Sequence, residues 1–368
     1  MQYPIRRTLR PEDARRSNLA LVLQAIYDES GLSRADIARA TGLTKVTVSD
    51  LVAELMAADL VWESGTSGNP RPGKPSTLLA FNAAARDILA MDLSARDQFR
   101  GAVLSLRGEP ILTVERPLDG AVGEDALAAA RELAAALRQA ATHPILGLGV
   151  GTPGTVNTSG TVLAAPNLHW HNLALQDLLH DDLDLPVRVE NDANVAVLAE
   201  RRFAGGPDDL VRVQLSRGVG AGLLVGGRLV HGAASDAGEI GHVVIDETGP
   251  ACSCGKTGCL ETWTSVPALN ARVQADPGHR DELLAEAGHR LGLALAPVVG
   301  MLGLQHIVVG GPAHITDTPL LNAARDCIAE RTRSEFRPEL ELLASSLGAN
   351  AVLLGSAALV LLGELGVG

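Results

Sequence analysis

Three of the four cysteines in this 368-residue chain, Cys252, Cys254 and Cys259, are crowded together a short distance after His242. In a cytosolic chain such clustering indicates metal ligation rather than disulfide formation. One imidazole and three thiolates fill a tetrahedral shell and leave no open position, so we predict a structural zinc ion, Zn2+, and not a catalytic metal. The fourth cysteine, Cys327, lies in a helical stretch and is expected to be a small buried apolar residue.

The length and composition point to more than one domain of the α/β class. A chain of 368 residues is too long for one ordinary core. Aromatic residues are only 2% of the sequence, so the cores must be built from Leu, Val, Ile and Ala. Uninterrupted apolar runs of membrane-spanning length are lacking, and the arginine-rich start has no apolar signal core. We therefore expect a cytoplasmic protein with no membrane partner.

The N-terminal segment has the pattern of a small helical domain with two strands. Apolar residues recur at helical spacing in three successive stretches, the first of which predicts a helix over 18–27. The second stretch begins at a capping-box pattern formed by Ser33 and Asp36, and Thr44 caps the third. Short apolar runs at 60–62 and 77–81 then enclose a loop rich in glycine and proline. This order predicts a winged helix-turn-helix.

The predicted third helix and the loop between the strands favour DNA binding. Small hydroxyls and a lysine on the first turns of that helix suit the major groove. Basic residues in the loop can follow the DNA backbone or enter the minor groove. The alternative is a helical module for protein interaction or dimerisation. The residues predicted to contact DNA are Arg34, Thr44, Lys45, Thr47, Ser49, Arg71 and Lys74.

The net charge of −12 is unusual for a DNA-binding protein, but the charge is unevenly distributed. Residues 1–80 contain 10 Lys or Arg against 9 Asp or Glu, whereas the remainder contains 21 against 34. Phosphate contact requires a local basic face and not a basic chain. The acidity belongs to the larger C-terminal part, and the first 80 residues permit DNA binding.

From residue 85 onward the pattern changes to alternating strands and helices. A long Ala/Leu helix is predicted over 124–141, and a buried helix over 285–304 is interrupted by Pro297. This alternation predicts a mixed α/β sheet, and we divide the chain into domains 1–84 and 85–368. The predicted strands cover 88–92, 102–106, 111–115, 145–150, 187–190, 211–215, 222–225 and 307–309.

Polar motifs follow two of these strands. Gly-Thr-Pro-Gly occupies 151–154, and Glu-Asn-Asp-Ala-Asn occupies 190–194. Ligands of open α/β sheets bind at the carboxyl ends of strands, and carboxylates and amides there can hydrogen-bond vicinal hydroxyls. The structural alternative is that Asn191 and Asn194 cap a turn or helix, and that Glu261 is a helix N-terminal carboxylate.

Taken together, these motifs resemble the ROK family of repressors and sugar kinases over nearly the whole chain. The resemblance implies a two-lobed, actin-like ATPase fold behind the winged helix-turn-helix, a structural zinc ion, and a sugar site between the lobes. The motifs are Ser-Arg-Ala-Asp at 33–36, Thr-Gly-Leu-Thr-Lys at 41–45, the motifs at 151–154 and 190–194, Ala-Gly-Glu-Ile-Gly-His at 237–242 and Cys-Ser-Cys-Gly-Lys-Thr-Gly-Cys-Leu-Glu at 252–261.

By position, the resemblance also implies site residues. His242 receives two roles, as a zinc ligand through one ring nitrogen and as a sugar neighbour through the other. Asp192 matches the catalytic base of the family's kinases, which takes a proton from a sugar hydroxyl. The implied sugar contacts are Asn167, Asn191, Asp192, Glu239, His242 and Glu261.

Two departures from the family pattern bear on activity. The kinases carry Asp-x-Gly-x-Thr where this chain has Asp92-Leu-Ser-Ala-Arg96, so Ser94 replaces the glycine that lets the backbone approach phosphate. In the wing, the regulators' Gly-Arg-Pro is Gly-Lys-Pro at 73–75, which keeps the charge but loses the planar guanidinium. We therefore expect a degraded ATP site and no enzymatic activity.

The sequence thus predicts a repressor of carbohydrate-metabolism genes that binds a double-stranded operator and responds to a small sugar effector. Two recognition helices of a homodimer, or of a tetramer, would occupy successive major grooves of an inverted repeat. One alternative is an ATP-dependent sugar kinase that also binds DNA. Another is a regulator that has lost sugar sensing and responds to a protein partner.

Overall fold

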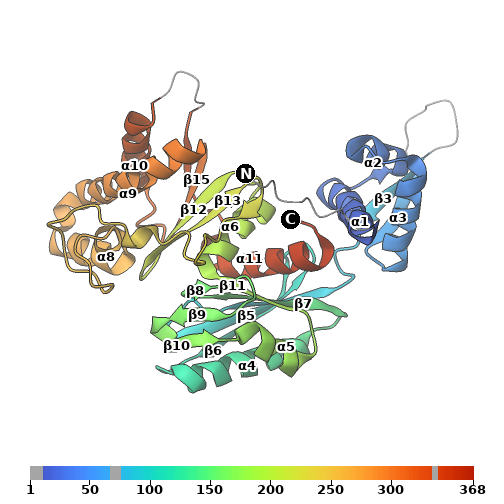
Figure 1. Cartoon of the computed structure of the whole chain (residues 1–368), viewed down its shortest axis with the longest axis horizontal. Coiled ribbons are helices and arrows are strands. Elements are labelled where there is room, and N and C mark those ends of the chain that lie inside the picture. Colours follow the sequence, from blue (N-terminus) through green and yellow to red (C-terminus); the bar gives the residue numbers. More distant parts are fainter. Residues whose placement is uncertain (1–10, 67–75, 334–338) are drawn as a thin grey trace, which may run out of the picture.

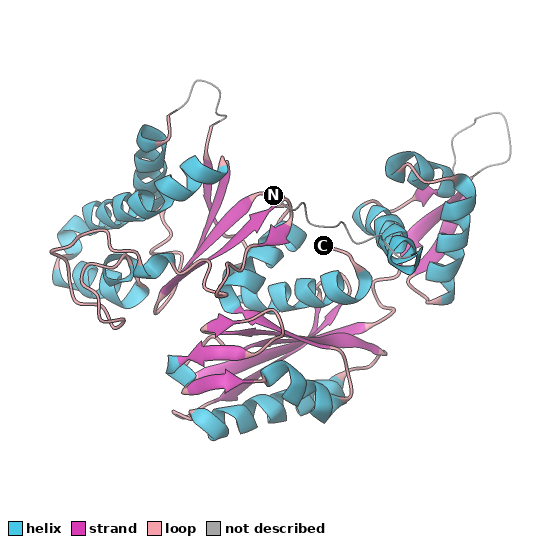
Figure 2. Ribbon diagram, in the orientation of Figure 1, coloured by secondary structure: helices cyan, strands magenta, loops and turns pink. Residues whose placement is uncertain are grey.

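The computed structural model describes residues 11–66, 76–333 and 339–368 and contains a helical head and two α/β lobes (Figure 1). The head lies on the right of Figure 1, the first lobe at the bottom centre and the second lobe on the left. Helices cover the faces of both large sheets (Figure 2). The predicted fold class, a winged helix-turn-helix followed by two α/β lobes, is therefore confirmed.

The head packs three helices on a small sheet with strand order β1-β3-β2. The capping box is present: the Ser33 hydroxyl accepts from the Asp36 backbone, and the Asp36 carboxylate accepts from the Ser33 backbone. Gly42 ends the second helix with a φ of +72°, a conformation that favours glycine. The elements are α1 (Pro11–Asp28), β1 (Leu32–Ser33), α2 (Arg34–Thr41), α3 (Lys45–Ala57), β2 (Val61–Thr66) and β3 (Thr77–Phe81).

Replacing Ser33 with alanine is expected to weaken α2. Loss of the cap leaves helix N–H groups without their acceptor, which costs about 1 kcal/mol. Amides of α2 should exchange hydrogen about fivefold faster in the full chain. Ser49→Ala is the matched control, because Ser49 lies within α3, where alanine is a good helix former. Equal exchange in the Ser33→Ala variant and the unmodified chain would show that the cap does not hold this helix.

The first lobe has a five-stranded sheet in the order β11-β7-β4-β5-β6. The strands β4, β7 and β11 are parallel, and β5 and β6 add as antiparallel strands. Because parallel strands end at the same edge, the motifs at 151–154 and 190–194 lie side by side. The strands of this sheet are β4 (Asp87–Asp92), β5 (Gln98–Ser105), β6 (Pro110–Pro117), β7 (Ile145–Thr152) and β11 (Val187–Asn191). The lobe also contains the helices α4 (Gly123–Ala140) and α5 (Leu175–Leu183). A small sheet consists of β8 (Thr155–Val156), β9 (Val162–Ala165) and β10 (Trp170–Leu173), with the turn η1 (Pro166–Leu168) between β9 and β10.

The second lobe has a five-stranded sheet in the order β14-β13-β12-β15-β16 and is joined to the first lobe through α6 (Asp192–Phe203). Its helices α9 and α10 approach so closely that a Cβ at Gly288 would lie 2.1 Å from the Leu320 carbonyl oxygen. The elements are β12 (Leu210–Leu215), β13 (Val219–Val225), β14 (Arg228–Leu229), η2 (Ile240–His242), α7 (Glu261–Thr264), α8 (Val266–Ala275), η3 (Pro277–His279), α9 (Arg280–Leu302), β15 (His306–Gly310), α10 (Thr318–Arg331) and β16 (Glu341–Ala344).

Two expectations about helices were wrong. The helix α9 continues through Pro297 to Leu302 instead of being interrupted. Apolar residues on both sides of the proline, among them Leu295 and Val299, are buried, and this packing outweighs the local cost of the missing N–H group. The first helix begins at Pro11, ahead of the apolar pattern, because its first turns are polar and exposed.

One described segment, Gly348–Leu365, is long and apolar enough to cross a membrane. It contains η4 (Gly348–Asn350), α11 (Ala351–Val360) and a final π turn, η5 (Leu361–Leu365). In the structure α11 packs between α6 and the first-lobe sheet, and Leu353, Ala357 and Val360 are buried. The composition of this segment is therefore that of a helix in a protein core.

The head and the first lobe share one apolar core. Tyr27 and Phe81 of the head pack in the same cluster as Leu104 and Leu106 of the lobe. The Tyr27 hydroxyl donates a hydrogen bond to the Leu106 carbonyl oxygen at 2.8 Å. Val367, next to the last residue of the chain, is buried in this cluster too. The position of the head on the lobe is therefore fixed by packing.

Candidate functional site

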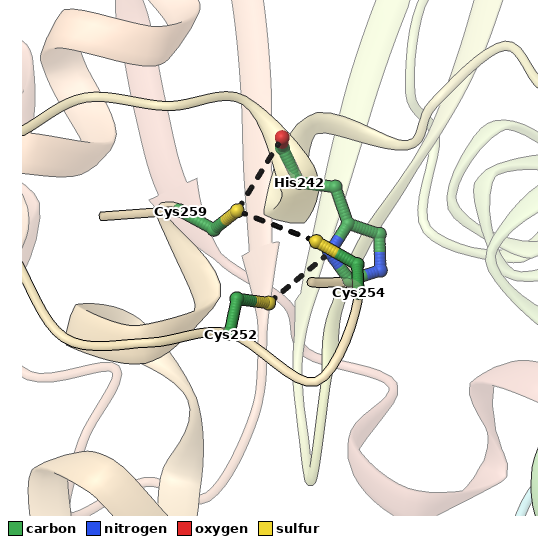
Figure 3. Close-up of side chains that lie close together, drawn as sticks. All are labelled: His242, Cys252, Cys254 and Cys259. Carbon is green, nitrogen blue, oxygen red and sulfur yellow. Dashed lines mark hydrogen bonds between the residues drawn. The ribbon is translucent and has the colours of Figure 1, made fainter. Parts of the chain in front are cut away.

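The predicted metal ligands converge at one point of the second lobe (Figure 3). The ligand atoms of His242, Cys252, Cys254 and Cys259 all lie within 4.8 Å of one another. The Cys252 sulfur is 3.6 Å from His242 Nδ1, and the sulfurs of Cys254 and Cys259 are also 3.6 Å apart. A tetrahedral zinc site with Zn–S bonds of about 2.3 Å has edges of about 3.7 Å. The four side chains therefore fit a zinc ion.

In the loop that carries the cysteines, the backbone segments pack very closely, and the environment shifts the pKa values of two of the thiols. At Gly258 the φ is +72°, and a Cβ there would lie 1.5 Å from the Asp246 carbonyl oxygen. A backbone hydrogen bond from Lys256 lowers the pKa of Cys254, whereas burial raises the pKa of Cys259 to about 12. A thiolate at Cys259 thus needs a cation beside it, which a metal ion would supply.

Three carboxylates, those of Asp192, Glu239 and Glu261, lie close enough to affect one another's ionisation. Burial, together with the neighbouring charges of Asp92 and Glu239, raises the pKa of Asp192 to about 7. Desolvation and the charge of Glu261 likewise raise the pKa of Glu239, whereas His242 lowers it. These mutual effects bring Asp192, Glu239, Glu261 and His242 into one electrostatic group. Such a group accepts hydrogen bonds from neutral hydroxyl donors and disfavours anions.

The remaining residues predicted to contact sugar, Asn167 and Asn191, differ in how many hydrogen bonds their side chains already make within the protein. Asn191 caps α6, accepting from the backbone of Ala193 and Asn194, and its amide donates to the Gly154 carbonyl oxygen at 2.8 Å. Asn167 is partly buried in the turn η1. The hydrogen bonds of Asn191 are therefore largely made within the protein, in agreement with the structural alternative, whereas Asn167 is half-buried in the first lobe.

Glu261 links the metal loop to the second-lobe sheet. Its carboxylate accepts a hydrogen bond from the backbone of Val219 at 3.0 Å. Glu261 is also the first residue of α7 and follows the last cysteine closely. A metal ion held at Cys259 would therefore fix the position of a carboxylate that belongs to the electrostatic group.

One polar pair was missed by the sequence analysis. His231 Nε2 lies 2.6 Å from a carboxylate oxygen of buried Glu190, and this hydrogen bond raises the pKa of His231. The other oxygen of Glu190 accepts from the Asn194 amide at 3.0 Å. The pair supports the turn that presents Asp192. No local spacing signals it, because the two residues are 41 positions apart.

The position of the kinase phosphate hairpin is filled by the protein itself. Asp92 is buried, and its carboxylate accepts hydrogen bonds from the backbone and the hydroxyl of Ser94, at 3.0 and 2.5 Å. Arg100 beside the hairpin donates to the Ala349 carbonyl oxygen and to Asn350. A side chain thus stands where the kinase pattern has the glycine of its phosphate turn.

The predicted DNA-contact residues lie on the head and differ in whether their side chains are exposed or already engaged within the protein. Lys45 and Ser49 are exposed on α3, and Thr44 caps that helix by accepting from the Thr47 backbone. Arg34 is turned toward β2, where it pairs with Glu63 at 3.1 Å. Arg71 and Lys74 lie outside the described residues.

The helix α6 connects the cleft to the head. It begins at Asp192, and its last turn carries Arg202, whose guanidinium stacks 3.8 Å from the centre of the Tyr27 ring. Arg202 also pairs with Asp28 at 3.1 Å. Two residues before Arg202, Glu200 forms a buried ion pair with Arg212 of the second-lobe sheet at 3.0 Å. One rigid helix therefore contacts the cleft, the second lobe and α1 of the head.

Family comparisons agree with this architecture. The ROK family profile matches residues 94–362, and the MarR family profile matches residues 20–68. The xylose repressor of Caldicellulosiruptor bescii is 31% identical over 94% of this chain and 95% of its own length. The xylose repressor of Bacillus subtilis is 29% identical over 94% of both chains.

Solved structures separate two groups within the family. A ROK family transcriptional regulator, a homologue of the E. coli MLC protein, has a TM-score of 0.83 and 27% identity over 96% of both chains. A ROK family glucokinase from Streptomyces griseus has a TM-score of 0.64 and 26% identity, and covers 74% of this chain and 98% of its own. The full-length matches are regulators, whereas this kinase lacks a counterpart of about a quarter of the chain. The chain therefore belongs to the ROK family, and its winged helix-turn-helix groups it with the transcriptional regulators of that family.

Proposed function

We propose that this protein is a sugar-responsive repressor of carbohydrate-metabolism genes that binds operator DNA through residues 1–84 and a small sugar through residues 85–368. The observation that carries the proposal is the course of α6, which begins at Asp192 in the proposed sugar site and ends with Arg202 packed against the head. A ligand changes DNA affinity only if it binds one conformation of the protein better than another. Sugar bound across the cleft favours one closure of the lobes, and α6 passes that change to α1. We take release of DNA as the response.

The effector is held by Asn167, Asp192, Glu239, His242 and Glu261, while Asn191 caps the helix that begins at Asp192. Carboxylates that accept hydrogen bonds from sugar hydroxyls suit the raised pKa values of Asp192 and Glu239, because such groups are poorly hydrated. The relatives named xylose repressors make xylose the first sugar to test. A bound zinc ion would hold the 242–261 loop closed and so orient His242 and Glu261 toward the ligand.

The protein does not transfer phosphate. Asp192 still stands at the position of the kinases' catalytic base. The carboxylate of Asp92, however, is engaged in hydrogen bonds with the hydroxyl and the backbone of Ser94, and a side chain at residue 94 blocks the close backbone turn that phosphate needs. Incubation with ATP and a panel of hexoses and pentoses is expected to release no ADP above the rate without sugar. Sugar-dependent ADP formation would instead favour the second candidate, a kinase that also binds DNA.

Replacing Arg202 with alanine is expected to separate sugar binding from DNA release. The change removes the stacking on Tyr27 and the ion pair with Asp28, while the cleft end of α6 is untouched. Calorimetry should give an unchanged sugar Kd. The factor by which sugar weakens DNA binding, typically about 5- to 150-fold in allosteric proteins, should fall at least about fivefold.

The neighbouring residue provides the control for this experiment. Arg201 pairs with Asp208 at 2.7 Å, a contact that does not involve the head. Arg201→Ala should therefore leave the coupling factor unchanged. An Arg202→Ala variant with full coupling, or an Arg201→Ala variant with equally reduced coupling, would contradict transmission through the contact of Arg202 with α1.

A further inference from the structure

The helix α3 presents an aliphatic side chain to solvent at its first turn. Val46 is 73% exposed, whereas Val48, Leu51 and Val52 of the same helix are fully buried. These buried residues fix the rotation of the helix, so that Val46 points away from the head core. A β-branched residue also has a lower helix propensity than Lys, Glu or Ala. Neither packing within the head nor helix formation accounts for valine at this position.

The hydroxyl residues around Val46 use part of their hydrogen-bonding capacity within the helix. Thr44 Oγ1 accepts from the Thr47 backbone at 3.2 Å and lies 2.9 Å from Thr47 Oγ1. The Ser49 hydroxyl donates to the Lys45 carbonyl oxygen at 2.9 Å. The methyl groups of Val46, in contrast, remain in water. The exposed methyl groups of Val46 are therefore the part of this turn that remains available for contact with a partner.

The side chains that share the face of Val46, one turn further along the helix, favour base edges over the DNA backbone. Ser49 and Asp50 follow at i+3 and i+4 and so share its face of the helix. Asp50 is exposed, and a carboxylate there repels phosphate but accepts a hydrogen bond from the cytosine amino group. An apolar and acidic face of a recognition helix suits the floor of the major groove.

We propose that Val46 is a specificity-determining residue that packs against the 5-methyl group of a thymine in the operator. Thymine is the base that presents a methyl group in the major groove. This inference rests on the proposed function, because it requires α3 to enter the major groove. It adds a residue that the hydroxyl and lysine pattern of α3 did not single out.

Deoxyuridine substitution tests the contact, since it removes only the 5-methyl group. The full chain is first used to select tight binders from a random duplex pool. Each thymine of one half-site is then replaced by deoxyuridine, one at a time, and Kd is measured for the unmodified chain, for Val46→Ala and for Leu21→Ala. Leu21 is the control, because it is an exposed leucine on α1.

At one thymine of the half-site, deoxyuridine is expected to weaken binding by the unmodified chain and by Leu21→Ala about fourfold, the factor for one buried methyl group. The same replacement should not change binding by Val46→Ala. Equal losses in the unmodified chain and Val46→Ala, or no sensitive thymine, would overturn the role of Val46 while leaving DNA binding intact. Failure to select any duplex would overturn the DNA-binding function, and the role of Val46 with it.

Discussion

Removing the metal, or replacing Cys259 with serine, is expected to unfold the 242–261 loop and abolish the sugar response. The loop has few elements of its own beyond two isolated β-bridges and the turn η2, so its conformation depends on the ligands His242, Cys252, Cys254 and Cys259. Structural zinc supplies about 10–16 kcal/mol of apparent binding free energy in small zinc domains. Loss of that energy leaves the loop with its two β-bridges, the turn η2 and a few backbone hydrogen bonds.

Metal analysis and hydrogen exchange check this expectation, and a sugar titration checks its consequence. Metal analysis should give one zinc ion per chain in the unmodified protein and less in Cys259→Ser. Hydrogen exchange should rise across 242–261 and leave the head, which lies far from the loop in Figure 1, unchanged. The control is Cys327→Ala, because Cys327 is buried against α9 and not among the ligands. A metal-free protein that still binds sugar normally would contradict the structural role of the ion.

Replacing Asp192 with asparagine is expected to weaken sugar binding about 10- to 100-fold at about pH 8, above the raised pKa of this carboxyl, because hydrogen bonds to a charged acceptor contribute about 1.5–3 kcal/mol. DNA binding should persist, so the variant would repress without responding to sugar. The same change should stabilise the sugar-free fold. The pKa of Asp192 rises from an ordinary 3.8 to about 7 in the folded protein, so the folded state binds more protons and loses stability as the pH rises.

The pH dependence of the unfolding free energy tests whether the pKa of Asp192 is raised. The unfolding free energy of Asp192→Asn, relative to the unmodified chain, should rise between about pH 4 and pH 7 and level off above it, by on the order of 3 kcal/mol. Denaturant titrations at several pH values measure the difference. Asp181→Asn, an exposed change on α5, should show no such rise. A constant difference across this range would show that Asp192 is not held in its protonated form.

Much of the fold could be predicted because its signals are local. The capping box at Ser33, the strand patterns and the spacing of the three cysteines depend on residues close in sequence. The ends of the elements were less well predicted. For example, β2 extends to Thr66, beyond the apolar run at 60–62, because pairing with β3 and not apolarity sets its length.

The features that sequence could not supply are those between distant segments. The pair of Glu190 with His231, and the stacking of Arg202 on Tyr27, join residues far apart in the chain. Likewise, whether Asn191 is a cap or a free sugar ligand depends on where its amide lies relative to Gly154. Such contacts follow from tertiary packing, and no periodicity or spacing signals them.

The most direct test of the account is fluorescence anisotropy of the full chain on labelled DNA from its own upstream region, with a scrambled duplex as control. Sugars are titrated without ATP, beginning with xylose. The account predicts preferential binding to the native duplex and its release by one sugar, in a titration that ATP does not change. Equal binding to both duplexes without any sugar response, or a response that requires ATP, would contradict a sugar-gated repressor.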